Sequence, residues 1–351
     1  MQNVECKMQN EGVALGDLFQ SFPQKIPQFC TLHFEFCISC VSTINCNLPD
    51  TYATFVVFVI IFHYLSFFCI QILFFLLKYT YRLKLPTEKR VIMREFFGFG
   101  GYQRPAEGFL SWQHLVFVSS LMVIMIGLAV FLGLRYKNAL PRQKNRVLIW
   151  AAFLIDGFEL FKIVLMCFRA NNPMDWLYNL PLFLCSIQLI AIPLAAFSKG
   201  RIKEAALDFV CIFGILGAVL GTYGAGQNYG CYPVLSFDNV VSGLTHSIAG
   251  FASLYILISG MASLKRKNIS ITFGILLFFC VAAYIANCLL DYNYMFLMAG
   301  DGTPYDILYN LVGGHKVFYP LSVVALFILY ICIYYGVCRL VRSKKRAKAA
   351  L

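Results

Sequence analysis

Seven long apolar runs constrain this chain more than any other feature of its sequence. A helix needs about 20 mostly apolar residues to cross roughly 30 Å of hydrocarbon. Such runs occupy residues of about 115–134, 147–168, 177–197, 206–225, 239–261, 271–291 and 317–338, and an eighth, 53–77, carries no charge. Strands of a membrane barrel would be about ten residues long with alternating polarity, so these runs predict helices. We therefore predict an all-α fold, a polytopic membrane bundle of seven core transmembrane helices plus an additional N-terminal hydrophobic helix.

Composition excludes the other broad classes of protein. Of the 351 residues 60% are apolar and 13% are charged, whereas about a quarter of the residues in a soluble domain are charged. Disordered chains, collagens and coiled coils need polar, Gly/Pro-periodic or heptad-charged sequences, which are absent here. A multi-pass membrane protein remains, with the lipid bilayer as its surroundings.

The Lys and Arg residues predict the orientation of the bundle. Seventeen follow the first, third, fifth and seventh core runs, against two, Arg169 and Lys316, after the second, fourth and sixth. Positively charged connections stay in the cytoplasm, so we predict a cell-membrane protein with a cytoplasmic C-terminus. The formal net charge of +12 is then largely membrane anchoring, and no nucleic-acid partner is expected.

We divide the chain into an N-terminal appendage, 1–108, a seven-helix membrane core, 109–340, and a basic cytoplasmic tail, 341–351. The appendage begins with polar residues that show no cleaved signal peptide. Its seven Lys and Arg between 78 and 104 conflict with an extracellular location of that stretch. Either the 53–77 run ends in the cytoplasm and the chain returns through residues 91–102, or that run does not cross in a simple way.

The cysteines fall into two groups. A cluster in the appendage lies beside His33 and consists of Cys30, Cys37, Cys40 and Cys46. A zinc site normally shows a second paired motif, so disulfides or unpaired thiols are favoured there. The cysteines within the apolar runs are expected to be small apolar residues rather than a disulfide framework.

Two polar residues from distant runs are predicted at similar depths. With about 1.5 Å of rise per residue, Cys185 lies about 12 Å and His246 about 10 Å below the outer surface. Asn287 and Asp291 lie one turn apart at the outer end of the sixth run. Ionisable residues inside a membrane are functional candidates by default because burying them is costly.

The second run carries Asp156, Glu159 and Lys162 at a spacing that places them on one helix face. The first interpretation is that Glu159 and Lys162 neutralise each other. The alternatives are a proton relay, or a carboxylate that orients His246.

Cys185 and His246 together predict nucleophilic chemistry. The thiolate is the reactive form of cysteine, so a thiol in an apolar site needs a base such as His246 to take its proton. Asn287, Tyr292 or backbone amides would then stabilise an oxyanion.

The segment from Phe109 to Tyr335 resembles a known family. The similarity is carried by FLSWQH (109–114), the Glu159 helix, LPLFLCS (180–186), LTHSIAGFASLYIL (244–257), NCLLDYNYMFL (287–297) and GTPYDILYNLVGGHKVFYPL (302–321). These pieces are similar to the bacterial YwaF family of integral membrane proteins, which is related to the animal transmembrane protein 164 acyltransferase. The resemblance implies a seven-helix fold and an acyltransferase with a Cys and His pair.

One motif departs from that family. The usual pattern is Pro-x-His-x-Cys, but position 183 is Phe here. In the animal relative the thiol directly follows the proline, where this chain has Leu182, and Cys185 lies three residues later on a similar face.

The leading hypothesis is a membrane lipid acyltransferase with Cys185 as nucleophile and His246 as base. Glu159 or Asp291 would orient the imidazole, and Asn287 would support the site. The substrates would be a membrane phospholipid and a lysophospholipid. No metal or soluble cofactor is expected, because no helix carries a ligand spacing such as H-E-x-x-H. The alternatives are a proton- or solute-coupled transporter that uses the charges of the second run, and a non-catalytic scaffold.

Overall fold

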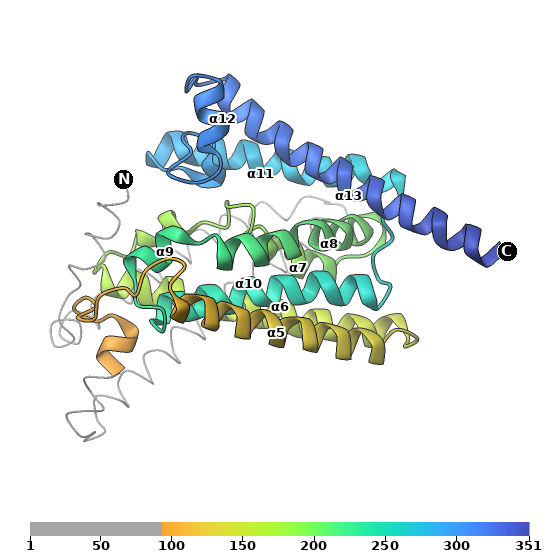
Figure 1. The fold of residues 1–351 in the computed structure, drawn as a ribbon, viewed down its shortest axis with the longest axis horizontal. Helices are drawn as coiled ribbons and strands as arrows, with labels where there is room; N and C mark the ends of the chain where they lie inside the picture. Colours follow the sequence, from red (N-terminus) through yellow and green to blue (C-terminus); the bar gives the residue numbers. More distant parts are fainter. Residues whose placement is uncertain (1–92, 351) are drawn as a thin grey trace, which may run out of the picture. The chain divides into compact units, whose positions relative to one another are not determined.

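The computed structural model describes residues 93–350, and over this range the chain is helical and contains no strand (Figure 1). The 53–77 run, the cysteine cluster and His33 lie outside the described residues. The elements are α5 (Trp112–Arg135), α6 (Pro141–Arg169), η1 (Asp175–Asn179), α7 (Gln188–Phe197), α8 (Gly200–Tyr223), α9 (Gly226–Cys231), α10 (Phe237–Ile258), η2 (Arg266–Asn268), α11 (Ile269–Leu290), η3 (Tyr294–Phe296), α12 (Asp306–Leu311) and α13 (Phe318–Ala350).

Five segments within the described range are long and apolar enough to cross a membrane: Trp112–Arg135, Gly200–Cys231, Phe237–Ile258, Arg266–Leu290 and Phe318–Val341. They agree with the first, fourth, fifth, sixth and seventh predicted runs and confirm a multi-pass, all-helical membrane protein. The second run forms the 29-residue α6, whose middle carries the charged trio of Asp156, Glu159 and Lys162. The count of seven core spans stays a prediction.

The prediction of one continuous helix over 177–197 is wrong. η1 ends at Asn179, residues 180–187 form turns, and α7 begins only at Gln188. Two local features explain the break. Pro181 has no N–H to donate, and the Ser186 hydroxyl accepts a hydrogen bond from the Phe183 N–H at 3.0 Å and donates one to the Phe183 carbonyl at 3.1 Å. Such local side-chain bonds compete with helical ones.

The described chain divides into two compact units. The first consists of residues up to Met125, Phe153–Asn179 and Val219–Ile248, and the second of Ile126–Ala152, Leu180–Ala218 and the chain from Ala249. The first unit has an aromatic core in which Phe99, Val164, Leu165, Phe237 and Val241 are buried together. Phe96 and Phe97 pack against this core, which contains Phe99, and the division of the chain at residue 108 stays a prediction.

A buried ion pair joins α6 to α10 inside the first unit. Arg169 donates two hydrogen bonds to the Asp238 carboxylate, at 2.6 and 2.7 Å. Both side chains are 7% exposed. The Tyr102 hydroxyl donates to the same carboxylate at 2.5 Å, and Arg169 also donates to the Phe97 carbonyl at 3.3 Å. Burial and the neighbouring Asp238 charge raise the pKa of Tyr102, so this phenol stays protonated and keeps its donor role.

A buried carboxylate organises one end of the second unit. Asp208 in α8 accepts hydrogen bonds from the backbone N–H groups of Ser263 and Leu264, at 3.1 and 2.9 Å. The Asn268 amide and the Tyr335 hydroxyl donate to it at 2.8 and 3.2 Å. Since a buried carboxylate needs such partners, Asp208 fixes the connection between α10 and α11.

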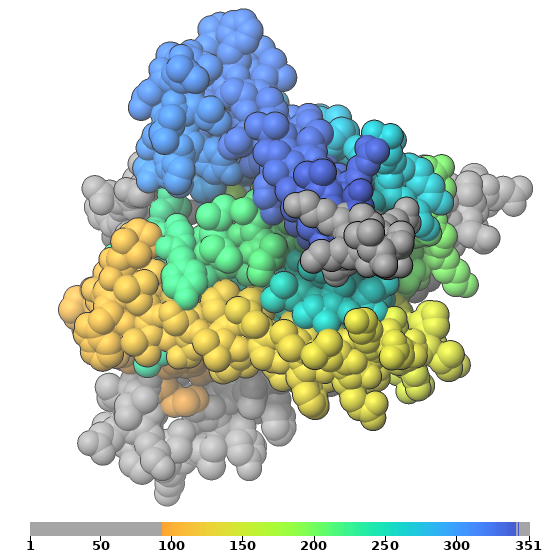
Figure 2. Space-filling model, turned by 45° about the vertical axis from the view of Figure 1, so that its right-hand side comes forward, coloured from red at the N-terminus to blue at the C-terminus, as the bar shows by residue number. Residues whose placement is uncertain are grey.

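The surface of α5 is strongly apolar. Val116, Val123, Ile124 and Phe131 are exposed, and the orange to yellow side chains of this helix lie open on the face drawn in Figure 2. Contiguous apolar surface of this kind marks contact with lipid or another apolar partner, which agrees with a membrane-spanning helix.

Candidate catalytic site

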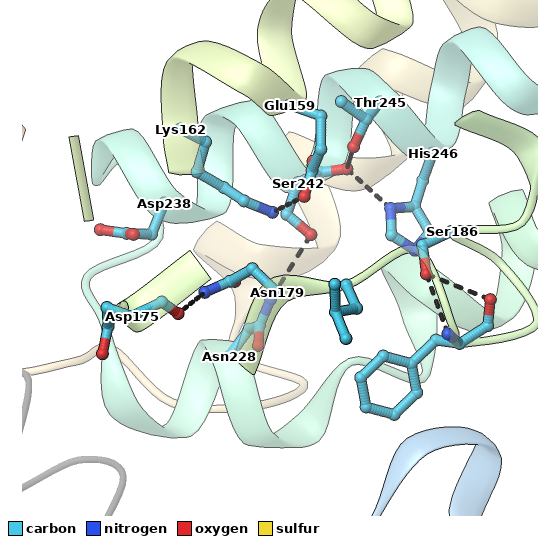
Figure 3. A network of polar contacts seen from close by, with 12 residues as sticks. Glu159, Lys162, Asp175, Asn179, Ser186, Asn228, Asp238, Ser242, Thr245 and His246 are labelled. Atoms are coloured by element: carbon cyan, nitrogen blue, oxygen red, sulfur yellow. Dashed lines mark hydrogen bonds and ion pairs between the residues drawn. The ribbon is translucent and has the colours of Figure 1, made fainter. Parts of the chain in front are cut away.

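His246 is held by its own helix in the first unit. Its Nδ1 lies 2.8 Å from the carbonyl oxygen of Ser242, one turn earlier in α10 (Figure 3). A carbonyl only accepts hydrogen bonds, so Nδ1 carries the proton. In the neutral ring Nε2 then holds the lone pair, which is the arrangement that a general base requires.

The absence of a side chain at Gly221 in α8 leaves the space that the His246 ring occupies. A Cβ atom at position 221 would overlap Cδ2 and Nε2 of the ring and lie 2.8 Å from Cγ. No residue other than glycine therefore fits without displacing the imidazole. The edge of the ring that carries Nε2 faces the α8 backbone.

The hydroxyls around Ser242 complete the histidine environment. Thr245 donates to the Ser242 carbonyl at 3.0 Å, and the Asn228 amide donates to the Ser242 hydroxyl at 3.4 Å. Ser242 and Asn228 were missed at the sequence level. The spacing of four residues between positions 242 and 246 was the available signal, because it matches a helical turn.

Glu159 pairs with Lys162 of the same helix. Their side-chain atoms Oε1 and Nζ are 2.6 Å apart, with 13% and 17% of the two side chains exposed. The interpretation of a self-neutralising pair is confirmed. The Ser242 carbonyl accepts the hydrogen bond of His246 Nδ1, and the expectation that Glu159 or Asp291 orients the imidazole stays a prediction. Asp291 is an exposed residue that ends α11 with a φ of 51°.

Cys185 lies in the turn between η1 and α7, in the second unit. It is not part of a disulfide. A Cβ atom at Gly217 of α8 would lie 3.3 Å from the Cβ of Cys185, so the two backbones approach closely here. Close approach at small residues is typical of packed membrane helices.

An aromatic loop lies next to the Cys185 turn within the second unit. Phe183 packs edge-on against Tyr294, with ring centroids 5.2 Å apart, and Phe296 stacks on Tyr305 at 5.3 Å. Burial and the nearby Cys185 charge raise the pKa of Tyr305 to about 12. Tyr305 is therefore a neutral hydrogen-bond donor at physiological pH.

Asn287 is committed to this same loop. Its Nδ2 donates to the Tyr294 carbonyl at 3.0 Å, and its Oδ1 accepts the Tyr294 N–H at 2.6 Å. The residue is buried and both ends of its amide are used. Asn287 therefore holds the backbone of the loop that follows α11 in its conformation.

Two other core histidines have structural partners. His114 is fully buried, accepts the Leu110 N–H at Nδ1 and donates from Nε2 to the Thr222 carbonyl, at 3.2 and 3.1 Å. His315 accepts the N–H groups of Val317 and Phe318 at the start of α13. Both therefore hold backbone segments in place.

The sequence model of the TMEM164 family matches residues 109–335. The chain belongs to the TMEM164 family. This match confirms the family resemblance at the level of TMEM164. No curated protein and no solved structure matched the chain.

The TMEM164 match covers every candidate residue of the core. Glu159, Cys185, His246, Asn287 and Asp291 all fall inside it. As a TMEM164-family protein the chain is a multi-pass membrane protein, in agreement with its apolar helices. In the part of the chain that the structure describes, no group of three or more His, Cys, Asp or Glu side chains is arranged to hold a metal ion.

Proposed function

We propose that this TMEM164-family protein is a membrane-embedded lipid acyltransferase in which Cys185 is the nucleophile and His246 the base. The observation that carries the proposal is the hydrogen bond from Nδ1 of His246 to the Ser242 carbonyl. It sets the tautomer in which Nε2 accepts a proton. His114 instead uses both ring nitrogens for backbone contacts, and Nδ1 of His315 accepts two backbone N–H groups, so its lone pair is occupied.

The break in the third apolar run also supports a reaction site. Irregular backbone at membrane depth is tolerated only where protein buries it or where it lines a cavity. Residues 180–187 supply such backbone and carry the thiol. A break of this kind therefore has a cost in the bilayer that a functional role would explain.

The proposed reaction exchanges one ester for another. His246 Nε2 takes the Cys185 proton, and the sulfur attacks the acyl carbonyl carbon of a phospholipid. The tetrahedral intermediate collapses with cleavage of the ester C–O bond, and the imidazolium protonates the departing lysophospholipid oxygen. The hydroxyl of a second lysophospholipid then attacks the thioester, gives its proton to His246 and releases the thiol.

The test is an acyl-transfer assay on the full-length protein in liposomes. A phospholipid with a labelled acyl chain is the donor and an unlabelled lysophospholipid the acceptor. Cys185→Ala and His246→Ala should each lower the transfer rate by at least about 10³-fold, because a nucleophile and its base act as a unit. Cys288→Ala and Cys332→Ala are matched controls, since both are exposed free cysteines, and should keep the wild-type rate.

A second measurement addresses the covalent intermediate. Wild-type protein mixed with donor alone should carry a hydroxylamine-sensitive acyl group on the peptide that contains Cys185. Wild-type transfer rates in both alanine variants, or acylation only at other positions, would refute the proposal.

A further inference from the structure

Gln188, the first residue of α7, is a fully buried polar side chain without a partner. Its exposed fraction is 0%, and neither the Nε2 nor the Oε1 atom of its amide has a hydrogen-bond partner among the described residues. Buried amides almost always have partners, because losing hydration without replacement is costly. An amide in this condition needs an explanation.

The turn that contains Cys185 sets where Gln188 points. The Gln188 N–H donates to the Cys185 carbonyl at 3.3 Å, and the next two residues repeat this i to i+3 pattern, Leu189 to Ser186 at 3.0 Å and Ile190 to Ile187 at 2.9 Å. The Ala191 N–H donates to the Ile187 carbonyl at 2.8 Å, so this turn leads directly into the α-helix α7, and residues three apart on a helical turn lie on one face. Gln188 therefore lies on the same face of this turn as Cys185.

We propose that Gln188 is a catalytic residue whose carboxamide N–H stabilises the oxyanion formed when Cys185 attacks an acyl ester. This inference rests on the proposed function. As the carbon–sulfur bond forms, the electron pair of the carbonyl bond moves to oxygen, and Nε2 donates a hydrogen bond to that oxygen. When the ester C–O bond breaks, the electron pair returns and the contact weakens. The contact is thus strongest in the transition state, which is what catalysis requires.

Gln188 is favoured over Asn287, the side-chain amide that the sequence suggested for this role. Asn287 uses both ends of its amide on the Tyr294 backbone. The Gln188 amide is neutral and has no bond to break before it meets the oxyanion, so it is preorganised for the role.

The experiment compares Gln188→Met and Gln188→Glu with wild type, all as full-length protein in liposomes of phosphatidylcholine. Methionine keeps the length of the side chain and removes the donor, and glutamate keeps the shape and replaces the donor with a negative charge. We expect kcat for acyl transfer to fall by about 10²–10³-fold in both variants, the loss typical of one oxyanion donor. KM for the acceptor lysophospholipid should change little.

Two further measurements distinguish catalysis from structure. In Gln188→Met the midpoint of unfolding by SDS in mixed micelles should equal or exceed that of wild type, because an unsatisfied buried polar group is replaced by an apolar one. The rate of Cys185 alkylation by iodoacetamide should be unchanged. Gln143→Met, at a residue whose side chain accepts the Leu140 N–H on the surface, is the matched control and should leave all values at wild type.

The outcomes separate this inference from the proposed function. A wild-type kcat in either folded variant, while Cys185→Ala is inactive, overturns the role of Gln188 alone. A Gln188→Met protein that unfolds more readily, or does not fold, means that the amide has a partner in the resting protein, and this also overturns the inference. Full activity of Cys185→Ala refutes the proposed function itself.

Discussion

Replacing Gly221 by alanine should displace the His246 ring and lower the rate of acyl transfer strongly, while the stability of the protein changes little. The new Cβ would overlap Cδ2 and Nε2 of the imidazole and lie 2.8 Å from Cγ, whereas ordinary contact begins at about 3.4 Å. The Cγ distance alone requires a shift of roughly 0.6 Å, and the overlap at Nε2 requires a larger one. A misplacement of about 1 Å in a catalytic group lowers rates by about 10²-fold, so we expect a loss of at least that size in acyl transfer.

The stability cost of the same substitution should be modest. Overpacking a core costs about 1–3 kcal/mol, and alanine in place of glycine inside a helix returns up to about 1 kcal/mol. SDS titration in mixed micelles gives the free energy of unfolding, and the liposome assay gives the rate. A large loss of rate with a small loss of stability is the expected signature.

Two other glycines calibrate this result. Gly217→Ala would bring a Cβ to 3.3 Å from the Cβ of Cys185, so a few tenths of an ångström of movement suffices and a smaller loss of rate is expected. Gly157→Ala in α6 meets no atom within 4 Å and should keep the wild-type rate. Equal rates in all three variants, or the largest loss at position 157, would refute the role given to the Gly221 contact.

Three further predictions concern the buried polar groups. Arg169→Met should lower the free energy of unfolding by about 3–5 kcal/mol, because it leaves the Asp238 carboxylate buried without its cation. Combining it with Asp238→Leu should recover much of that loss in an SDS titration. Additive losses in the double variant would contradict this account. Asp208→Ala removes the acceptor of two backbone N–H groups and should speed amide hydrogen exchange in residues 259–268. Unchanged exchange would show that other contacts hold the connection between α10 and α11. His114→Phe should destabilise the protein by about 1–3 kcal/mol and leave kcat of the folded protein unchanged, in contrast to His246→Ala; a matching loss of kcat would show that His114 takes part in the reaction.

Much of the fold could be predicted because membrane helices follow from local sequence. Apolar runs of about 20 residues are sufficient signals, since backbone groups in lipid must be satisfied within the segment. The Glu159 and Lys162 pair was also predictable, because residues three apart on a helix are neighbours whatever the rest of the chain does. The break at 180–187 was not. Its hydropathy is that of a helix, and the bonds between Ser186 and Phe183 that interrupt it are short-range choices that hydropathy does not record.

The candidate site was predictable only in part. His246 and Cys185 stood out as polar residues at similar predicted depth. The hydrogen bonds of His246 to Ser242 and of Asn287 to Tyr294 could not be predicted from the sequence, because each depends on which atom a side chain reaches in the fold. Gln188 could not be predicted, because only the structure shows that its buried amide has no hydrogen-bond partner among the described residues.

The sequence alone determined that this chain is a multi-pass helical membrane protein of the TMEM164 family, because hydrophobic length and family motifs are properties of the linear chain. The tertiary structure decided which polar groups are occupied and which are available. It assigned Arg169 to Asp238, His114 to two backbone segments and Asn287 to a loop. The physical reason is that a buried hydrogen bond joins atoms brought together by folding, often from residues far apart in the chain, so no local pattern encodes its partner.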